Sequence, residues 1–251
     1  MSATDAAAAA ASAAGPEPAE FVPGPEWPLS TRLRYRLTGQ YRGEIHGQAQ
    51  VEWLREGTHY QMNLDVTVGP SFLPLISRRL SSDGVLTADG ISPRRYDEET
   101  RVFLSSGRHA TLWFSNDQVQ WSDGRSEPRP AGLQDAASQF VQLSWLFLTG
   151  RETLAPARQL ALPLALPRKL YPWRYQVQGQ EQLDTPIGSL ATWHLVPLIE
   201  GGTRDLKAEV WLAPAVQYLP VRMRIKQDDQ TYVDLLIESA PMQAAPDVPP
   251  P

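Results

Sequence analysis

The stretch at residues 132–150, GLQDAASQFVQLSWLFLTG, constrains the fold of this chain most, because its pattern fits only a helix. Its apolar side chains cover more than one face of a spiral of about 3.6 residues per turn, which predicts a helix enclosed on several sides. Asp135 lies where a side chain can cap the first turn, and Gly150 lies where a left-handed residue can end a helix. The sequence therefore predicts one buried helix at about 133–149.

This helix is not expected to cross a membrane. At ~1.5 Å per residue it is about 25 Å long, and polar residues interrupt it at Gln134, Asp135, Ser138, Gln139 and Gln142. No run in the chain reaches the ~18 uninterrupted apolar residues of a spanning helix. The sequence therefore predicts no transmembrane segment.

Most of the remaining pattern alternates with a period of two. Residues 31–40 place Leu33 and Leu37 opposite arginines, residues 48–54 place Val51 and Trp53 on one face, and residues 60–68 continue the alternation. These three runs predict an antiparallel meander. Further strands are expected at residues 79–87, 93–96, 101–105, 111–115, 118–122, 159–166, 173–178, 189–198, 206–212, 220–226 and 231–238.

One helix among so many strands predicts a mainly β fold. Because strands and helices do not alternate, a parallel doubly wound sheet is not expected. We expect a curved antiparallel sheet or open barrel of about ten to twelve strands, wrapped around one central α-helix. Residues 27–240 form the single β-rich domain of this prediction, between a disordered Ala/Pro-rich linker at 1–26 and a disordered Pro-rich tail at 241–251.

Composition excludes several classes of function. The formal net charge is −5 with the basic residues scattered among acids, so no nucleic-acid surface is expected. The absence of cysteine removes disulfides, thiol catalysis and thiolate metal sites. The Ala-rich start carries no intact signal peptide, and no sequence motif indicates a cofactor.

Candidate catalytic groups are few. None of the four histidines lies at a metal-ligand spacing from another, and we expect His59 and His194 to face solvent or bond locally. No serine lies in a nucleophile elbow, and the acidic runs at 97–99 and 228–229 are expected in turns. The sequence therefore predicts no catalytic residue and no metal ligand.

Large apolar side chains remain as the candidate ligand-binding set. Most of them project toward the predicted interior, where a packed core is the simpler interpretation and a ligand cavity the alternative. Residues 69–76, GPSFLPLI, are expected either to fold over this core or to form a hydrophobic lip. The ligand-binding candidates are Trp53, Met62, Phe72, Phe140, Trp145, Trp173 and Met223.

The chain also resembles a bacterial domain family of unknown function found in envelope-associated proteins. The resemblance rests on SSDGVLTADGISPRRYDEETR (81–101), QDAASQFVQLSWLF (134–147), YQVQGQEQLDTPIGSLATWHLVPL (175–198) and EVWLAPAVQYLPVRMRIKQDD (209–229). It implies a domain exported to the periplasm, with a sheet-around-helix shape similar to carriers that shuttle lipoproteins between membranes. It implies no catalytic residue, since the family has none established.

These expectations combine into two hypotheses. The first is a non-enzymatic periplasmic domain that binds a lipid or another apolar ligand, such as an acyl chain, between sheet and helix. The alternative is a structural or protein-interaction module of the cell envelope, with a filled core and a protein partner at a sheet edge or at the arginines of residues 220–226.

Overall fold

The computed structural model describes residues 21–24, 27–70, 74–198, 207–228 and 230–244. Strands dominate the first half of this part of the chain. They are β1 (Thr31–Gln40), β2 (Glu44–Glu56), β3 (His59–Val68), β4 (Ile76–Thr87), β5 (Gly90–Val102), β6 (Arg108–Phe114), β7 (Gln118–Trp121), β8 (Ser126–Pro128) and β9 (Gln134–Asp135).

The second half begins with the helix and then returns to strands. Its elements are α1 (Ser138–Leu148), β10 (Gln159–Ala161), β11 (Leu164–Ala165), β12 (Leu170–Tyr171), β13 (Arg174–Thr185), β14 (Gly188–Leu198), β15 (Lys207–Ala213), the 3-10 helix η1 (Pro214–Val216), β16 (Leu219–Asp228), β17 (Thr231–Ile237) and β18 (Met242–Gln243). The predicted mainly β fold with an α-helix at this place is confirmed.

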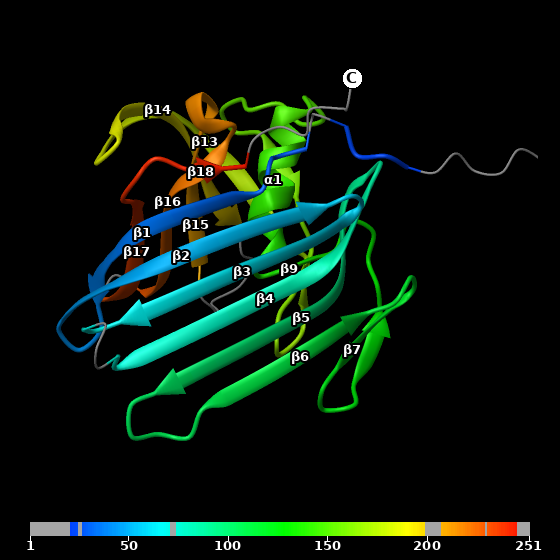
Figure 1. Cartoon of the computed structure of the whole chain (residues 1–251), viewed down its shortest axis with the longest axis horizontal. Helices are drawn as coiled ribbons and strands as arrows, with labels where there is room; N and C mark the ends of the chain where they lie inside the picture. Colours follow the sequence, from blue (N-terminus) through cyan, green and yellow to red (C-terminus); the bar gives the residue numbers. More distant parts are fainter. Residues whose placement is uncertain (1–20, 25–26, 71–73, 199–206, 229, 245–251) are drawn as a thin grey trace, which may run out of the picture.

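Fifteen of the described strands form one antiparallel sheet (Figure 1). Its order is β10-β13-β14-β15-β16-β17-β1-β2-β3-β4-β5-β6-β7-β8, with β18 paired to β1, so the order ends at β10 and β8 and the sheet is not closed. The expected count of about ten to twelve strands is wrong. Two of the fifteen strands, β8 and β18, have only three and two residues, which is too short for an alternating pattern to be recognised.

The predicted meander of the first three long strands is confirmed. Leu33 lies opposite Val51, which lies opposite Leu64, and this register continues to Leu80 in β4. Because side chains alternate across a strand, β1 buries every second residue from Thr31 onward and exposes its arginines. The alternation of apolar and polar residues in the sequence therefore arises because only one face of the strand is buried.

The acidic run at 97–99 is not a turn. The two strands expected at 93–96 and 101–105 are one strand, β5, and these acids lie inside it. Neighbouring cations and hydroxyls hold the carboxylates: Arg95 and Thr111 donate to Asp97, and Arg78 lies 2.9 Å from Glu98. Consecutive acids indicated a turn in the sequence because Arg78 and Thr111, which also hold them, come from the neighbouring strands β4 and β6.

Helix α1 starts later than expected. Instead of beginning at about 133, the helix begins at Ser138, because Gln134 and Asp135 form strand β9. This strand pairs with β11 in a second sheet of order β12-β11-β9. The predicted end is confirmed, since Gly150 adopts φ 66° just beyond the last turn and donates to the Phe147 carbonyl.

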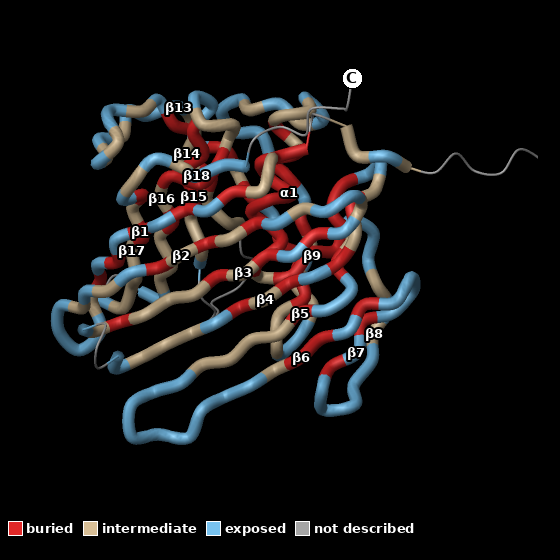
Figure 2. The backbone as a smooth tube through the Cα atoms, in the orientation of Figure 1, coloured by how far each residue is buried: buried red, intermediate tan, exposed pale blue. Residues whose placement is uncertain are grey.

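The helix is buried among strands from both halves of the sheet. Nine of its eleven residues are buried, and α1 contacts β5, β9 and β16. Buried residues gather around α1, whereas the ends of β3–β6 that lie away from it are mostly half-buried or exposed (Figure 2). No helix in the described part of the chain is long and apolar enough to cross a membrane.

Both ends of the described chain lie against the folded part. Phe21, inside the expected linker, is half-buried against the core, and Trp27 stacks on Trp145 with ring centroids 4.9 Å apart. Strand β18 pairs with β1, which extends regular structure past residue 240. Residues 1–20, 25–26 and 245–251 of the expected linker and tail lie outside the described residues.

Candidate functional site

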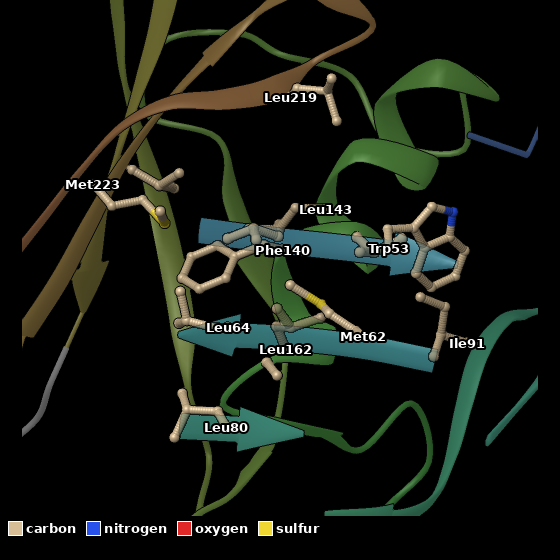
Figure 3. Packing of buried hydrophobic residues seen from close by; sticks show 14 of the residues in the cluster. Trp53, Met62, Leu64, Leu80, Ile91, Phe140, Leu143, Leu162, Leu219 and Met223 are labelled. Carbon is tan, nitrogen blue, oxygen red and sulfur yellow. The ribbon is translucent and has the colours of Figure 1, made fainter. Parts of the chain in front are cut away.

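A small apolar cavity lies between α1 and the sheet. Its volume is about 30 Å³, and its walls come from β1, β2, β3, α1, β16 and the segment before β1. The lining residues are Pro28, Thr31, Leu33, Tyr35, Val51, Trp53, Met62, Phe140, Val141, Ser144, Leu219, Pro220 and Met223. In Figure 3, Met62, Phe140 and Met223 point into the same region between the helix and the strands.

The hydroxyls that line this cavity already have partners. Thr31 donates to the Leu29 carbonyl at 2.6 Å, Tyr35 donates to the Pro220 carbonyl at 2.7 Å, and Ser144 donates to the Phe140 carbonyl at 3.1 Å. Burial raises the pKa of Tyr35 well above its usual range, so its hydroxyl stays protonated. The lining therefore suits hydrocarbon rather than a polar substrate.

The cavity is much smaller than a ligand-sized pocket. A volume of about 30 Å³ holds roughly one or two small groups, whereas ligand pockets measure about 300–1,000 Å³. Met62 and Met223 are the side chains most able to make more room, because methionine is unbranched and changes rotamer easily. A chain-like ligand would therefore have to displace these side chains and the Phe140 ring.

The structure brings four of the seven candidate residues together at this cavity: Trp53, Met62, Phe140 and Met223. Trp53 is held in place by its indole, which donates to the Pro28 carbonyl at 3.1 Å. Their role in binding a ligand remains a prediction, because buried apolar residues are also what an ordinary core requires.

The other three candidates lie elsewhere. Trp145 stacks on Trp27 beneath Arg151 and faces a wider, more open depression of about 510 Å³, which Thr87 and Thr149 also line. Trp173 is buried beside β13 and makes edge contacts with Tyr171 and Tyr175. Phe72 lies outside the described residues.

A buried polar cluster joins the start of α1 to β3 and β4. The Asp135 carboxylate accepts hydrogen bonds from the backbone N–H groups of Ala137 and Ser138 at 2.9 and 2.8 Å, and from the Ser82 hydroxyl at 2.6 Å. Ser82 has a single proton, which it gives to Asp135, so the Tyr60 hydroxyl donates to Ser82 at 3.0 Å. The cluster thus satisfies the first orphan donors of the helix.

Burial controls the acid–base properties of this cluster. It raises the pKa of Asp135 to about 6, although the hydrogen bonds from Ser82, Ser138 and Ala137 oppose the change. Asp135 and Ser82 are completely buried, and neither lines the two cavities described above. The arrangement of acid, serine and tyrosine therefore anchors the helix from inside the core.

Gln134 of β9 and Gln142 of α1 hold β5 by hydrogen bonds to its backbone. The Ile91 N–H donates to the Gln142 side-chain oxygen at 2.8 Å, and the Gln134 amide donates to the Ile91 carbonyl at 2.9 Å. Gly90 permits this contact, because a Cβ on it would lie 2.3 Å from the Gln142 amide nitrogen.

The sequence did contain a signal for the Asp135 cluster. Ser82 is a polar residue that lies in line with Leu80 and Leu86 on the inner face of β4.

His194 does meet acidic residues, but on the outer face of the sheet. It stacks on Trp211 with centroids 4.0 Å apart, and its Nε2 atom lies 3.1 Å from Glu209. Burial raises the pKa of Glu209, yet hydrogen bonds and charge from Lys226 and His194 hold it below its usual value. Neither His194 nor Glu209 lines a described cavity, so the pair belongs to an ion-pair network rather than a cleft.

In the part of the chain that the structure describes, no group of three or more histidine, aspartate or glutamate side chains could hold a metal ion. The arginines of β16 are paired, with Arg222 bonding Asp234 through two nitrogens and stacking 4.7 Å from the Trp211 ring centre. The site that remains is the apolar cavity beside α1.

These features define a class of protein: an open antiparallel sheet that packs a helix against an apolar interior. The family model described as "Protein of unknown function (DUF3108)" matches residues 34–236, and the chain belongs to this family. No curated protein matches the sequence.

A solved structure of another family is similar in fold. It is described as the "Crystal Structure of Beta-barrel-like Protein of Domain of Unknown Function DUF1849 from Brucella abortus". The likeness has a TM-score of 0.56 at 12% sequence identity and covers 87% of this chain and 99% of that chain. At this identity it carries information on the fold alone.

Proposed function

We propose that this protein is a non-enzymatic periplasmic domain that binds an apolar ligand, such as a lipid or acyl chain, between the sheet and α1. The sheet in this proposal wraps around a central helix, and α1 forms one wall of the site. The carrying observation is the cavity lined by Trp53, Met62, Phe140 and Met223, whose neighbouring hydroxyls are all engaged by carbonyls. The periplasmic location rests on the family resemblance.

Methionine supports this proposal in a specific way. Met62 reaches the cavity from β3 and Met223 reaches it from β16. Rotamer changes in these two side chains would therefore widen the cavity on two sides. Phe140 projects into it from α1. Removing that ring should enlarge the space without touching the strands.

A matched pair of variants tests the site. Phe140→Ala removes a side chain that lines the cavity, and Leu143→Ala removes one from the same helix that is buried but does not line it. We expect Phe140→Ala to change the affinity for a dansyl-labelled fatty acid at least about fivefold and Leu143→Ala to leave it within about twofold. Equal effects, or no binding of the fatty acid to the native protein, would contradict the proposal.

The second candidate function is a structural or protein-interaction module of the cell envelope with a filled core. The observation that favours it is the cavity volume of only about 30 Å³. Its partner would pair with one of the short end strands, β8 or β10, or contact the arginines of β16. Native mass spectrometry of the protein purified from bacterial envelopes separates the two, since a bound lipid adds a small mass and a protein partner a large one.

A further inference from the structure

The inner face of the sheet still carries apolar side chains at the strand ends that lie away from α1, but it is no longer fully buried there, and the Arg78–Glu98 ion pair interrupts it on β4 and β5. Ile45, Val66, Ile76, Ile225 and Val233 continue the inward-facing rows of their strands, and all five are only half-buried. The same rows are buried nearer α1 (Figure 2). We call these five residues the open end of the inner face.

Three turns at this open end carry exposed apolar side chains. Tyr41 lies between β1 and β2, Leu75 lies just before β4, and Val102, Phe103 and Leu104 lie where β5 turns into β6. These five residues, 42–92% exposed, are named here the rim. The turns that carry them are at the lower left of Figure 1, at the ends of the strands that lie away from α1.

Backbone hydrogen bonds hold two of these turns and the start of β2 side by side. The Gly69 N–H donates to the His46 carbonyl at 2.8 Å, and the Leu75 N–H donates to the Val68 carbonyl at 2.9 Å. The Phe103 N–H in turn donates to the Leu75 carbonyl at 2.8 Å. Leu75 and Phe103 therefore form one fixed patch.

Leu104 is the residue hardest to explain by folding alone. It is 92% exposed and has φ 58°, a left-handed conformation that is unfavourable for a residue other than glycine. Exposing a leucine at the tip of a turn gains no burial within the domain. An outlier of this kind points to a surface that meets something else.

The charges next to the rim are mostly positive. Arg42 lies in the first turn, and Arg101 and Arg108 flank the third. The acid nearest to Arg42 along the chain is Glu44, the first residue of β2. Arg101 is paired with Glu99, whereas within the described residues Arg42 and Arg108 have no carboxylate partner. Arg42 lies over the ring of Tyr41, 5.6 Å from its centroid. Apolar tips flanked by arginines, two of them without a carboxylate partner, complement an anionic lipid surface.

We propose that the rim docks on a phospholipid bilayer that contains anionic lipid, with Phe103 and Leu104 inserted below the headgroups. Turn tips offer side chains rather than an unpaired strand edge, which is a geometry for insertion and not for strand addition to another protein. Docking in this orientation sets the open end of the inner face against the bilayer. The inference rests on the proposed function, because a bilayer is where an acyl-chain ligand is exchanged.

Vesicle flotation tests the rim directly with the full chain. We expect the native protein to float with vesicles of phosphatidylcholine mixed with phosphatidylglycerol, and less with phosphatidylcholine alone. The double variant F103S/L104S should weaken partitioning at least about tenfold. Leu54→Ser, which changes a leucine that is 47% exposed near the opposite end of β2, is the matched control and should bind as the native protein does.

The outcomes separate this inference from the proposed function. Binding of a fatty-acid probe is measured on the same variants, and F103S/L104S should retain it while losing the vesicles. Failure of the native protein to float, equal flotation of F103S/L104S, or an equal loss in Leu54→Ser overturns the rim whatever the probe does. A self-association that F103S/L104S abolishes without any vesicle binding also overturns it, because the rim would then be a contact between copies.

Discussion

Replacing Asp135 with asparagine is expected to change how the free energy of unfolding depends on pH. Burial raises the pKa of this carboxyl from its ordinary value of 3.8 to about 6. A pKa difference of this size corresponds to about 3 kcal/mol. The folded state therefore holds a proton on Asp135 over a pH range in which the unfolded chain has already released it.

The sign follows from linkage. Because the folded-state pKa is the higher one, the contribution of Asp135 to stability is fully present below about pH 4 and is lost as the pH rises through about 6. Asparagine cannot ionise, so its contribution stays constant. It keeps an oxygen for the N–H groups of Ala137 and Ser138, and its amide can donate to Ser82 where the carboxylate accepted.

Urea unfolding followed by tryptophan fluorescence measures this difference. Between about pH 4 and about pH 8 the stability of Asp135→Asn should rise by about 3 kcal/mol relative to the native protein. The rearranged hydrogen bonds add a constant offset of about 1 kcal/mol. The control Asp89→Asn removes a negative charge from a side chain that is 98% exposed. A difference between native protein and Asp135→Asn that is constant with pH, or that changes in the opposite direction, would refute the reasoning.

Three further changes have defined outcomes. Glu209→Gln should lower the free energy of unfolding near neutral pH by about 1–2 kcal/mol, because the ion pair with Lys226 is lost. The effect should shrink as the pH falls through the lowered pKa of Glu209, and urea unfolding midpoints measured across pH check this. Leu143→Ala should lower the free energy of unfolding by about 2–5 kcal/mol, because removing this completely buried side chain leaves a cavity. Thermal unfolding measures the loss, and a loss below about 1 kcal/mol would contradict the prediction. Gly90→Ala should destabilise by more than about 1 kcal/mol, because its φ is +118° and a Cβ would overlap Gln142; an unchanged melting temperature would argue against that contact.

Much of the sheet could be predicted because burial on one face writes a period of two into the sequence. Strand β1 buries alternate residues over almost its whole length, and β3 does so from Tyr60 to Leu64, so their pattern is unambiguous. The short strands β8 and β18 have too few residues to show any period. Their pairing depends on the neighbouring strand and not on their own side chains.

The start of the helix depended on contacts that the sequence does not display. Asp135 was expected to cap the first turn from inside a longer helix, but its carboxylate also receives Ser82, which lies 53 residues earlier. Gln134 reaches Ile91 in the same way. Such long-range hydrogen bonds draw these two residues out of the helix and into β9.

The candidate site was predictable only as a set of inward-facing residues. Phe140 and Trp145 are five positions apart on the helix, which places them about 140° apart around its axis, so one meets the cavity and the other meets Trp27. Trp173 faces inward beside two tyrosines that the sequence does not bring together with it. Pattern identifies the buried face, whereas the contacts within it depend on how the sheet bends.

Photo-crosslinking with a fatty acid that carries a diazirine in its chain tests the central claim most directly, because each adduct reports the residue that touches the ligand. After irradiation and peptide mapping, we expect adducts on the peptides that contain Met62, Phe140 and Met223, which line the cavity. These adducts should fall when unlabelled fatty acid competes. Adducts confined to the rim or to other exposed residues, or none at all, would contradict a ligand site between the sheet and α1.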